Sequence, residues 1–347
     1  MVKAICNELE SRKAYLTTPV ETIYLGGGTP SLLEGSELAK ILDRVISLFN
    51  IVDNPEITLE ANPEDLTTEK SQELRSLGIN RLSIGIQTFD TNKLKWMNRA
   101  HDARQSFEAY DNVRKAGFDN VSLDLIYALP DSAPELFQKD MEMMVQLRPE
   151  HISVYGLTIE EKTVFGKQLE KGILAEMPED SAAQQYLTTI SFLAKNGYDQ
   201  YEVSNFSREG FHSKHNTGYW EHKSYLGVGP GAHSYNQKSR RFNIRNNNKY
   251  VKATQFGERF FEEEILSKTQ QTNERILTGL RTSNGINLLD LEHFSGKDLS
   301  RLKKELINQL AAKKLIAVEN NRLKLSPEGF LVADEIALQL FFDESQI

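Results

Sequence analysis

The chain has 347 residues, a formal net charge of −8 at pH 7 and one cysteine, Cys6. Its length predicts one large domain with a smaller one, and its excess of acidic residues argues against broad binding to nucleic acid or anionic membranes. A single thiol excludes an internal disulfide and any metal or iron–sulfur site that needs several cysteines of this chain. Because no apolar run is long enough to cross a bilayer and no signal-peptide core is found, we expect a cytoplasmic protein.

Short β-branched runs alternate with helical patterns from Val20 to about Asn205, which is typical of βα units around a parallel sheet. The predicted strands are Thr22–Leu25, Ile57–Ala61, Arg81–Ile86, Val121–Tyr127, Ile152–Leu157 and Tyr201–Ser204. The predicted helices are Leu38–Phe49 with Ser36 as its N-cap, Thr67–Leu77, Gln105–Ala116, Pro134–Leu147 and Ser181–Asn196. Six or so parallel strands with right-handed crossovers predict a full or partial barrel, with an open sheet as the alternative.

The first predicted strand runs directly into Gly26, Gly27 and Gly28, and Thr29-Pro30 then signals the start of a helix. Glycine lacks the Cβ that would hold a small molecule away from the main chain, so this segment can offer backbone N–H and C=O groups to a polar ligand. The spacing fits neither a Walker loop nor the dinucleotide pattern G-x-G-x-x-G. The segment therefore predicts a different kind of small-molecule site at a strand end.

Polar residues also stand at the ends of the following strands. They are Glu60 with Asn62-Pro63, Gln87, Asp124, and Tyr155 with Thr158. Ligand sites in such folds gather at the carboxyl ends of the strands, so we expect these side chains to converge on one opening. A buried structural network is the alternative for any one of them.

The rest of the chain has two further parts. The segment Phe206–Asn248 is rich in Gly, Asn, His and aromatic residues without clear periodicity, which predicts a lid or a loop-rich sheet rather than a helix. From about Thr269 to Phe342 the pattern predicts helix, helix, hairpin and helix, as in a small winged-helix-like domain. Its elements are helices Gln271–Leu280 and Lys297–Leu310, a hairpin at Asn320-Asn321, and a last helix opened by Ser326-Pro327. The predicted boundaries are 1–205, 206–268 and 269–347.

Several motifs, in order, resemble those of radical S-adenosylmethionine (SAM) proteins of the coproporphyrinogen dehydrogenase group. They are LGGGTP at Leu25–Pro30, LEANP at Leu59–Pro63, RLSIGIQTF at Arg81–Phe89 and DLIYALP at Asp124–Pro130. Three more resemble the heme-chaperone branch of that group: YEVSNF at Tyr201–Phe206, HNTGYW at His215–Trp220 and GVGPGAHS at Gly227–Ser234. The resemblance covers essentially the whole chain and implies a partial (β/α)6-type barrel that lacks its first strand.

The resemblance also implies ligands for particular residues. The methionyl end of SAM would lie near Gly27, Gly28 and Thr29, which face its ammonium, and near Glu60 and Gln87. Arg99 would pair with the methionyl carboxylate of SAM. The ribose hydroxyls would donate to Asp124, Tyr155 and Thr158 would border the adenosine, and His233 would lie near the adenine. Heme would contact His215 as axial ligand and Tyr219 and Trp220 through flat apolar surface. The alternatives are a surface ion pair for Arg99 and an ordinary hydrogen-bonding role for His215. A zinc site at His212, His215 and His222 is not expected, because no cysteine or nearby carboxylate completes it.

The chain departs from the family in one respect. Radical SAM proteins hold a [4Fe–4S] cluster with a C-x-x-x-C-x-x-C loop that follows the first barrel strand and precedes a helix resembling Val2–Tyr15, and this chain has only Cys6. We expect it to be a shortened form of a longer protein rather than a natural cluster-less relative. Because this chain lacks the three cysteines, we do not expect it to cleave SAM, and we assign no catalytic residue.

The leading functional hypothesis is a heme chaperone that passes heme to acceptor hemoproteins such as respiratory enzymes, with transient contact at the membrane side. The alternative is an oxygen-independent coproporphyrinogen III dehydrogenase, against which stand the HNTGYW motif and the missing cysteines. A third hypothesis is nucleic-acid binding by the C-terminal region, where basic residues outnumber acidic ones between Lys297 and Lys324. That excess is modest, so we expect a packing domain and no nucleic acid.

Overall fold

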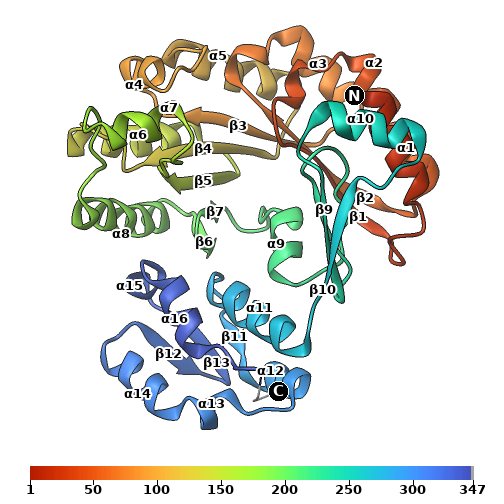
Figure 1. Ribbon diagram of the computed structural model, residues 1–347. Helices are drawn as coiled ribbons and strands as arrows, with labels where there is room; N and C mark the ends of the chain where they lie inside the picture. Colours follow the sequence, from red (N-terminus) through yellow and green to blue (C-terminus); the bar gives the residue numbers. More distant parts are fainter. Residues whose placement is uncertain (345–347) are drawn as a thin grey trace. The chain divides into compact units, whose positions relative to one another are not determined.

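The computed structural model describes residues 1–344, and a seven-stranded sheet with the order β1-β2-β3-β4-β5-β7-β6 dominates it (Figure 1). The strands are β1 Val20–Leu25, β2 Ile51–Ala61, β3 Arg81–Gln87, β4 Val121–Tyr127, β5 His151–Gly156, β6 Asp199–Glu202 and β7 Asn205–Ser207. The pairs β2–β3, β3–β4 and β4–β5 are parallel, which confirms the predicted α/β class with a parallel sheet.

The prediction that Tyr201–Ser204 forms a sixth parallel strand is wrong. The segment forms parts of β6 and of the turn to β7, and β7 pairs antiparallel with both β5 and β6. Only Val203 and Ser204 lie between β6 and β7, and so short a connection can join antiparallel strands but cannot make a parallel crossover.

The chain folds into two compact units. One comprises Tyr24–Leu32 and Ile57–Ser213 and contains most of the sheet with its helices; the other comprises Met1–Ile23, Leu33–Glu56 and the residues from Lys214 onward. The helices of the first unit are α3 Thr68–Ser76, α4 Thr91–Trp96, α5 Ala103–Lys115, α6 Pro134–Leu147, α7 Val164–Glu170 and α8 Glu179–Lys195, with 3₁₀ turns η1 Pro30–Leu32 and η2 Pro63–Asp65. Figure 1 shows α5, α6 and α8 around strands β3, β4 and β5.

The two faces of the sheet differ in chemistry because side chains alternate along each strand. On β3 the apolar set is fully buried, and it consists of Leu82, Ile84 and Ile86. The other face carries polar residues, and the strand register aligns four of them in one row across β2, β3, β4 and β5: Glu60, Ser83, Ser122 and His151. One face of this sheet is therefore a polar surface in the first unit.

The second unit begins with two helices, α1 Val2–Ser11 and α2 Gly35–Leu48. The predicted N-cap Ser36 is wrong, because the helix starts earlier: Glu34 is the N-cap and forms a reciprocal capping box with Glu37. Further along the chain the unit contains α9 Lys214–Trp220, β8 His233–Tyr235, β9 Ser239–Asn243, α10 Asn247–Phe256 and β10 Phe261–Ile265. The last three strands form an antiparallel sheet in the order β10-β9-β8.

Helix α9 contradicts the prediction that the segment Phe206–Asn248 contains no helix. The carboxylate of Glu56 accepts hydrogen bonds from the backbone N–H groups of Lys214 and His215, both at 3.0 Å. These are N–H groups that the first turn of a helix leaves unsatisfied, so Glu56 stabilises the start of α9 from 158 positions away in the chain.

The C-terminal part of this unit combines helices with a small sheet in the order β11-β13-β12. Its elements are α11 Lys268–Leu280, β11 Ile286–Asn287, α12 Leu288–Ser295, α13 Leu299–Leu302, α14 Lys304–Ala312, β12 Ile316–Glu319, β13 Arg322–Leu325, α15 Pro327–Phe330 and α16 Ala333–Leu340. The predicted hairpin is confirmed: Asn320 and Asn321 both have positive φ, 50° and 61°, as a two-residue type I′ turn requires. The predicted helix Lys297–Leu310 is instead two helices that meet at Lys303.

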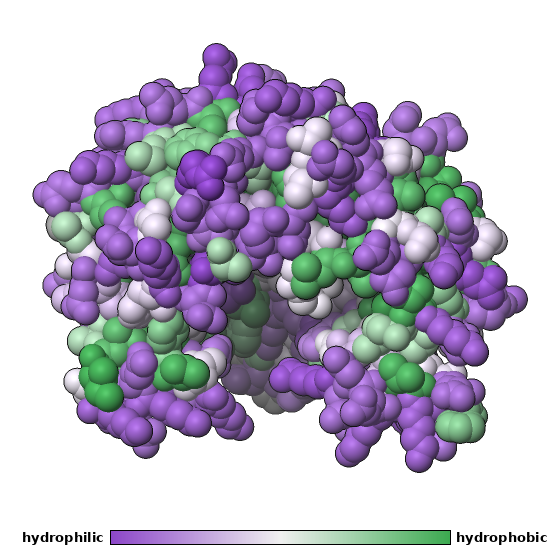
Figure 2. All heavy atoms as spheres, turned by 90° about the horizontal axis from the view of Figure 1, so that it is seen from above, coloured by the Kyte–Doolittle hydropathy of each residue, from purple (hydrophilic) through white to green (hydrophobic). Residues whose placement is uncertain are grey.

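No helix among residues 1–344 is long and apolar enough to span a membrane. The face shown in Figure 2 is mostly hydrophilic, with apolar side chains in small scattered groups. The last residues of the predicted third domain, 345–347, lie outside the described part of the chain.

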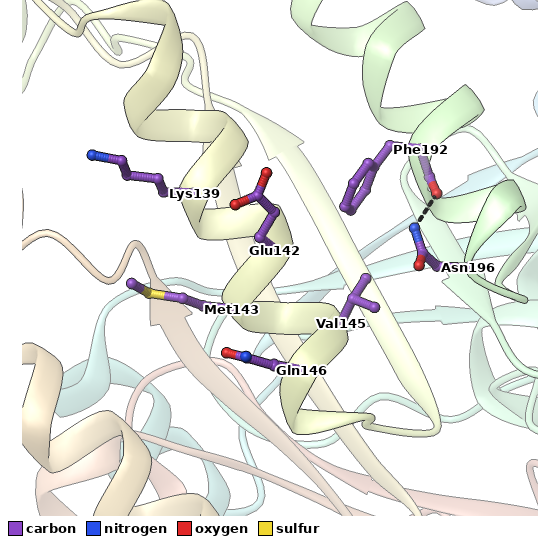
Figure 3. Close-up of a pocket in the computed structure, with 7 residues that line it drawn as sticks. All are labelled: Lys139, Glu142, Met143, Val145, Gln146, Phe192 and Asn196. Atoms are coloured by element: carbon purple, nitrogen blue, oxygen red, sulfur yellow. Dashed lines mark hydrogen bonds between the residues drawn. The ribbon is translucent and has the colours of Figure 1, made fainter.

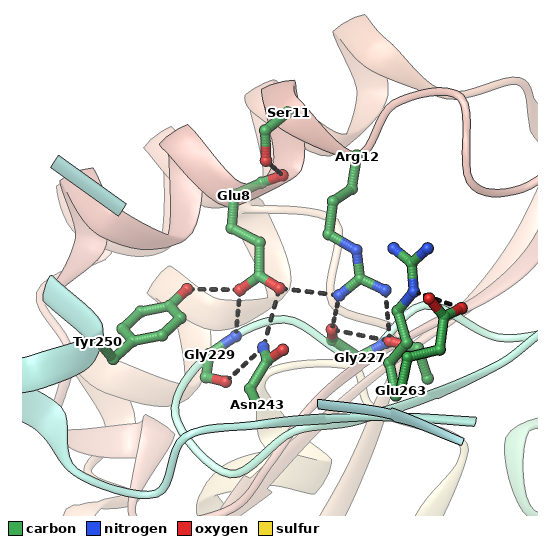
Figure 4. A network of polar contacts seen from close by, with 10 residues as sticks. Glu8, Ser11, Arg12, Gly227, Gly229, Asn243, Tyr250 and Glu263 are labelled. Atoms are coloured by element: carbon green, nitrogen blue, oxygen red, sulfur yellow. Dashed lines mark hydrogen bonds and ion pairs between the residues drawn. The ribbon is translucent and has the colours of Figure 1, made fainter. Parts of the chain in front are cut away.

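A buried carboxylate joins α1 to the glycine-rich segment that precedes β8 (Figure 4). Glu8 has no exposed surface and accepts hydrogen bonds from Arg12 at 2.9 Å, the backbone N–H of Gly229 at 2.9 Å, Asn243 at 2.8 Å and the Tyr250 hydroxyl at 2.5 Å. Burial and the negative charge of Glu8 raise the pKa of Tyr250, which keeps the phenol protonated as a donor.

Arg12 extends this network. Its guanidinium donates to the carbonyl oxygen of Gly227 at 3.1 Å and to the hydroxyl of Ser234 at 2.8 Å. One buried ion pair thus fixes both ends of the segment from Gly227 to Ser234.

We predict that Glu8→Ala lowers the free energy of unfolding by about 3–5 kcal/mol, because it leaves the buried Arg12 guanidinium without its anion. Urea unfolding measures the change. Glu10→Ala is the matched control, since Glu10 lies on the same helix but pairs with Lys13 and Arg44 at the exposed surface. Equal destabilisation by the two variants would contradict the role assigned to Glu8.

Candidate functional site

The three glycines after β1 satisfy two different requirements. A Cβ on Gly26 would lie 2.6 Å from the Tyr24 ring and 2.8 Å from the Glu60 carboxyl group, so packing demands glycine there. Gly27 and Gly28 have φ values of 77° and 127°, which glycine adopts most easily, and a Cβ on either would point into open space. The main chain at Gly27 and Gly28 is therefore exposed.

Glu60 holds this strand end in place. Its carboxylate accepts a hydrogen bond from the Tyr24 hydroxyl at 2.8 Å and one from the backbone N–H of Gly27 at 3.1 Å. The Gly27 N–H is thus engaged within the protein, and the carbonyl of Gly27 is the group left for a ligand. Thr29 accepts from Leu32 through its backbone carbonyl at 3.1 Å and so opens the η1 turn.

Gln87 ends β3 in a strained conformation, with φ at 69°. Its side-chain amide lies against Gly85, where a Cβ would come within 2.7 Å of Nε2. Arg99 reaches the same place: its guanidinium donates to the Gly85 carbonyl at 3.1 Å and to the Asn62 side chain at 2.9 Å. The structure therefore brings Gln87 and Arg99 together over Gly85.

The environment of Arg99 does not match a surface ion pair. Among residues 1–344 no carboxylate lies within ion-pair distance of its guanidinium, and its Nε is buried without a hydrogen-bond partner. A partly buried cation that only neutral oxygens contact is suited to an anionic ligand.

Asp124 lies on the polar face beside three serines. Its carboxylate is 3.3 Å from the Ser83 hydroxyl and 3.4 Å from the Ser122 hydroxyl, and it also accepts from Ser153. Burial raises the pKa of Asp124 to about 6, against the opposing effects of the Ser153 hydrogen bond and the Arg81 charge. The carboxylate form, which can accept hydrogen bonds from ligand hydroxyls, therefore predominates above about pH 6.

Sequence reasoning missed a buried chain of hydrogen bonds that continues from Asp124. Ser122 lies 2.8 Å from Nδ1 of His151, and Nε2 of His151 lies 2.7 Å from the Tyr201 hydroxyl. His151 has no exposed surface, and burial holds its pKa well below the usual value, so the imidazole is neutral. The signal was present in the polar–apolar alternation of β3, of β5 and of β4 as far as Leu125, which marks one face as polar before any strand end is reached.

The remaining predicted SAM residues differ in their relation to these hydrogen bonds. Tyr155, at the end of β5, is 44% exposed and forms a hydrogen bond with Ser153, which also donates to Asp124. Thr158 follows on an exposed segment. His233 belongs to the second compact unit, where its ring packs edge-on against Phe242 at a centroid distance of 4.8 Å.

The predicted heme residues gather on α9 in the second unit. His215 and Tyr219 are four positions apart on one helical face, and the Tyr219 hydroxyl lies 2.9 Å from Nε2 of His215. On the other side of the ring, Nδ1 of His215 lies 2.9 Å from the Thr22 hydroxyl. The indole N–H of Trp220 is buried without a hydrogen-bond partner, which is the kind of group that a ligand or ordered water satisfies.

A surface pocket on the first unit is separate from all of these residues (Figure 3). It lies between α6 and the end of α8, and its lining residues are Lys139, Glu142, Met143, Val145, Gln146, Phe192 and Asn196. The Asn196 side chain donates a hydrogen bond to the Phe192 carbonyl at 2.8 Å. Because the lining residues come from α6 and the end of α8, the pocket is a gap between these two helices. None of the predicted site residues lines it.

Comparisons with known proteins decide the family. The pattern of the Radical SAM superfamily matches residues 7–144, and that of the HemN C-terminal domain matches residues 266–332. The protein named heme chaperone HemW of Lactococcus lactis subsp. lactis (strain IL1403) is 35% identical over 336 residues, which is 97% of this chain and 88% of that protein. The chain belongs to the HemW group of the radical SAM superfamily. HemW of Bacillus subtilis (strain 168) is 34% identical over 91% of this chain and 84% of its own length.

The fold agrees with this membership of the HemW group. The solved structure of coproporphyrinogen III oxidase (HemN) from Escherichia coli, a radical SAM enzyme, matches with a TM-score of 0.83 over 98% of this chain and 82% of that chain, at 21% identity. An identity of 21% is too low to transfer an activity, but the structural match confirms the predicted radical SAM partial barrel.

The radical SAM family uses SAM and an iron–sulfur cluster, and the residues of this chain fit the two unequally. The open main chain at Gly27 and Gly28 and the unneutralised Arg99 fit a zwitterionic ligand. The only thiol, Cys6, lies on α1 with its sulfur 3.9 Å from the Lys40 carbonyl, and one thiol cannot supply the three thiolates of a cluster.

We predict that Asp124→Asn stabilises the protein at pH 7.5 but not at pH 4. The folded state holds the pKa of Asp124 above the unfolded value of 3.8, so its contribution to stability is present below pH 4 and is lost as pH rises through 6. Removing the ionisable group recovers a free energy on the order of 1–3 kcal/mol at pH 7.5. Urea unfolding at both pH values, with the exposed Asp119→Asn as control, measures this, and a gain that is equal at the two pH values would contradict it.

Proposed function

We propose that this protein is a heme chaperone that binds heme through His215 of α9. Relatives named heme chaperone HemW, at 31–35% identity over most of the chain, support the proposal, as does the placement of the imidazole. The single observation that carries it is the hydrogen bond between Nδ1 of His215 and Thr22. An imidazole that binds a metal through one nitrogen is normally held in place by a hydrogen bond on the other.

The surrounding residues prepare His215 for this role. If Nδ1 donates its proton to the Thr22 hydroxyl, the lone pair of the neutral imidazole is on Nε2. Glu56 fixes the backbone at His215 through its N–H, so the ring is anchored at both its main chain and its inner nitrogen. Trp220 adds an apolar surface with one buried donor that a propionate or water can satisfy.

SAM is the second ligand that we propose, at the carboxyl ends of the strands of the first unit. Arg99 would hold the methionyl carboxylate, and the main chain at Gly27 and Gly28, with Thr29 beside them, its amino end. Asp124 would hold the ribose hydroxyls, with Glu60 and Gln87 supporting the site. In radical SAM proteins an iron–sulfur cluster supplies the electron that cleaves SAM. Because the thiols of this chain do not fit a cluster, the proposal includes SAM binding and no cleavage step.

The acceptor of the heme would be a hemoprotein such as a respiratory enzyme, and the chaperone would act in the cytoplasm with transient contact at the membrane. These statements rest on the family resemblance. Transfer of heme from the loaded protein to a candidate apo-hemoprotein, followed by absorption, is the direct test of an acceptor.

We predict that His215→Ala weakens hemin binding at least about tenfold, because the axial nitrogen is lost. Titration with hemin, monitored in the Soret region, measures the dissociation constant. His212→Ala is the matched control, since His212 is an exposed histidine that stacks on Tyr201. If His215→Ala binds hemin as the unaltered chain does, His215 is not the ligand.

For SAM we predict weak binding that Arg99→Met reduces by a further factor of about ten, because the ligand carboxylate loses its cation. Equilibrium dialysis with labelled SAM measures it. Arg104→Met is the control, because Arg104 forms an exposed ion pair with Glu108 on α5. Equal binding by the two variants would remove Arg99 from the site.

A further inference from the structure

Both ring nitrogens of His215 are engaged in this structure. Nδ1 lies 2.9 Å from the Thr22 hydroxyl and Nε2 lies 2.9 Å from the Tyr219 hydroxyl. The two rings meet edge-on, with centroids 4.9 Å apart and planes at 81°. An iron ion that uses Nε2 must therefore replace the Tyr219 hydroxyl as its partner.

Proton counting leaves two arrangements for these hydrogen bonds, because the Thr22 and Tyr219 hydroxyls can each donate or accept. Burial, followed by the effect of Tyr225, raises the pKa of Tyr219 to about 12, so Tyr219 is a neutral phenol with one proton to donate near pH 7. A neutral imidazole carries one N–H and one lone pair. In the arrangement where Nδ1–H donates to the Thr22 hydroxyl, the Nε2 lone pair accepts the phenol proton. That is the same lone pair that would bind a metal.

Tyr219 can leave this position without unfolding α9. Its side chain is 41% exposed, and it lies one helical turn after His215. Its ring also meets the Tyr225 ring edge-on, at a centroid distance of 4.8 Å, which favours the inward position. The phenol thus has a defined closed position and free solvent on its outer side.

We propose that Tyr219 is a displaceable cap on Nε2 of His215, so that heme iron and the phenol compete for one lone pair while Thr22 holds the imidazole in place. The inference rests on the proposed heme site and adds a regulating residue to it. The Tyr219 cap lowers the affinity of His215 for heme. It also favours heme release, since the phenol returns to Nε2 as the iron leaves. A carrier that must release its heme benefits from this exchange.

The cap separates two roles that Tyr219 has in the heme motif. The aromatic ring offers apolar surface whether the hydroxyl is present or absent, whereas the competition depends only on the hydroxyl. Tyr219→Phe removes the hydroxyl and retains the ring, so it tests the cap with little disturbance of packing.

The first experiment is a hemin titration of the unaltered chain, Tyr219→Phe, Tyr225→Phe and His215→Ala. Loss of one hydrogen bond to the competing lone pair predicts about two- to tenfold tighter binding by Tyr219→Phe. Tyr225→Phe, which removes a hydroxyl from the neighbouring ring, is expected to bind as the unaltered chain does. If Tyr219→Phe binds hemin as the unaltered chain does or more weakly, while His215→Ala still weakens binding, the cap is wrong. If His215→Ala binds hemin as the unaltered chain does, the proposed heme ligand is wrong instead.

The second experiment needs no heme. Diethyl pyrocarbonate acylates the free lone pair of a neutral imidazole, so the rate of modification of His215, followed by peptide mass spectrometry, reports how often Nε2 is uncapped. We expect a rate increase of about two- to tenfold in Tyr219→Phe and none in Tyr225→Phe. An unchanged rate in Tyr219→Phe would overturn the cap even if heme binding is lost for another reason.

Discussion

Carboxylates that accept backbone N–H groups from distant parts of the chain hold the irregular segments of this protein in place. Such bonds are charge-assisted, and each contributes about 1.5–3 kcal/mol when the carboxylate is shielded from water. They occur at the glycine strand end, at the start of α9, in the glycine-rich segment before β8, just after β3 and at the first residue of β4. The pairs are Glu60 with Gly27, Glu56 with His215, Glu8 with Gly229, Asp140 with Phe89 and Glu150 with Val121.

These hydrogen bonds explain how a segment of low helix propensity can form a helix of the candidate heme site. The run from His215 to Trp220 contains Asn216, Thr217 and Gly218, none of which favours a helix. Seven residues are too few for a stable isolated helix, so α9 depends on a tertiary contact at its first turn. The helix in turn sets the four-residue spacing that brings the Tyr219 hydroxyl onto His215.

The same physics marks the limit of what the sequence predicts. Local signals were sufficient for the parallel strands, the glycine strand end and the Asn320-Asn321 turn, because each depends on neighbouring residues. The helical state of α9 was missed because its cap, Glu56, lies 158 positions away. The Ser122–His151 contact was missed because the two residues lie at the starts of β4 and β5, 29 positions apart in the chain, and only the alternation within the strands indicates that they share a face. Which ligand each polar residue serves came from family motifs and remains a prediction.

The left-handed backbone of Gln87 has a consequence for stability. A non-glycine residue in that conformation costs about 1 kcal/mol or more, and glycine at the same position would be relaxed. Glycine at position 87 would therefore relieve the backbone but would remove the side-chain amide that lies against Gly85. The residue that would stabilise this strand end and the residue that presents an amide beside Arg99 are thus different, so stability and the polar surroundings of Arg99 cannot both be optimised at one position.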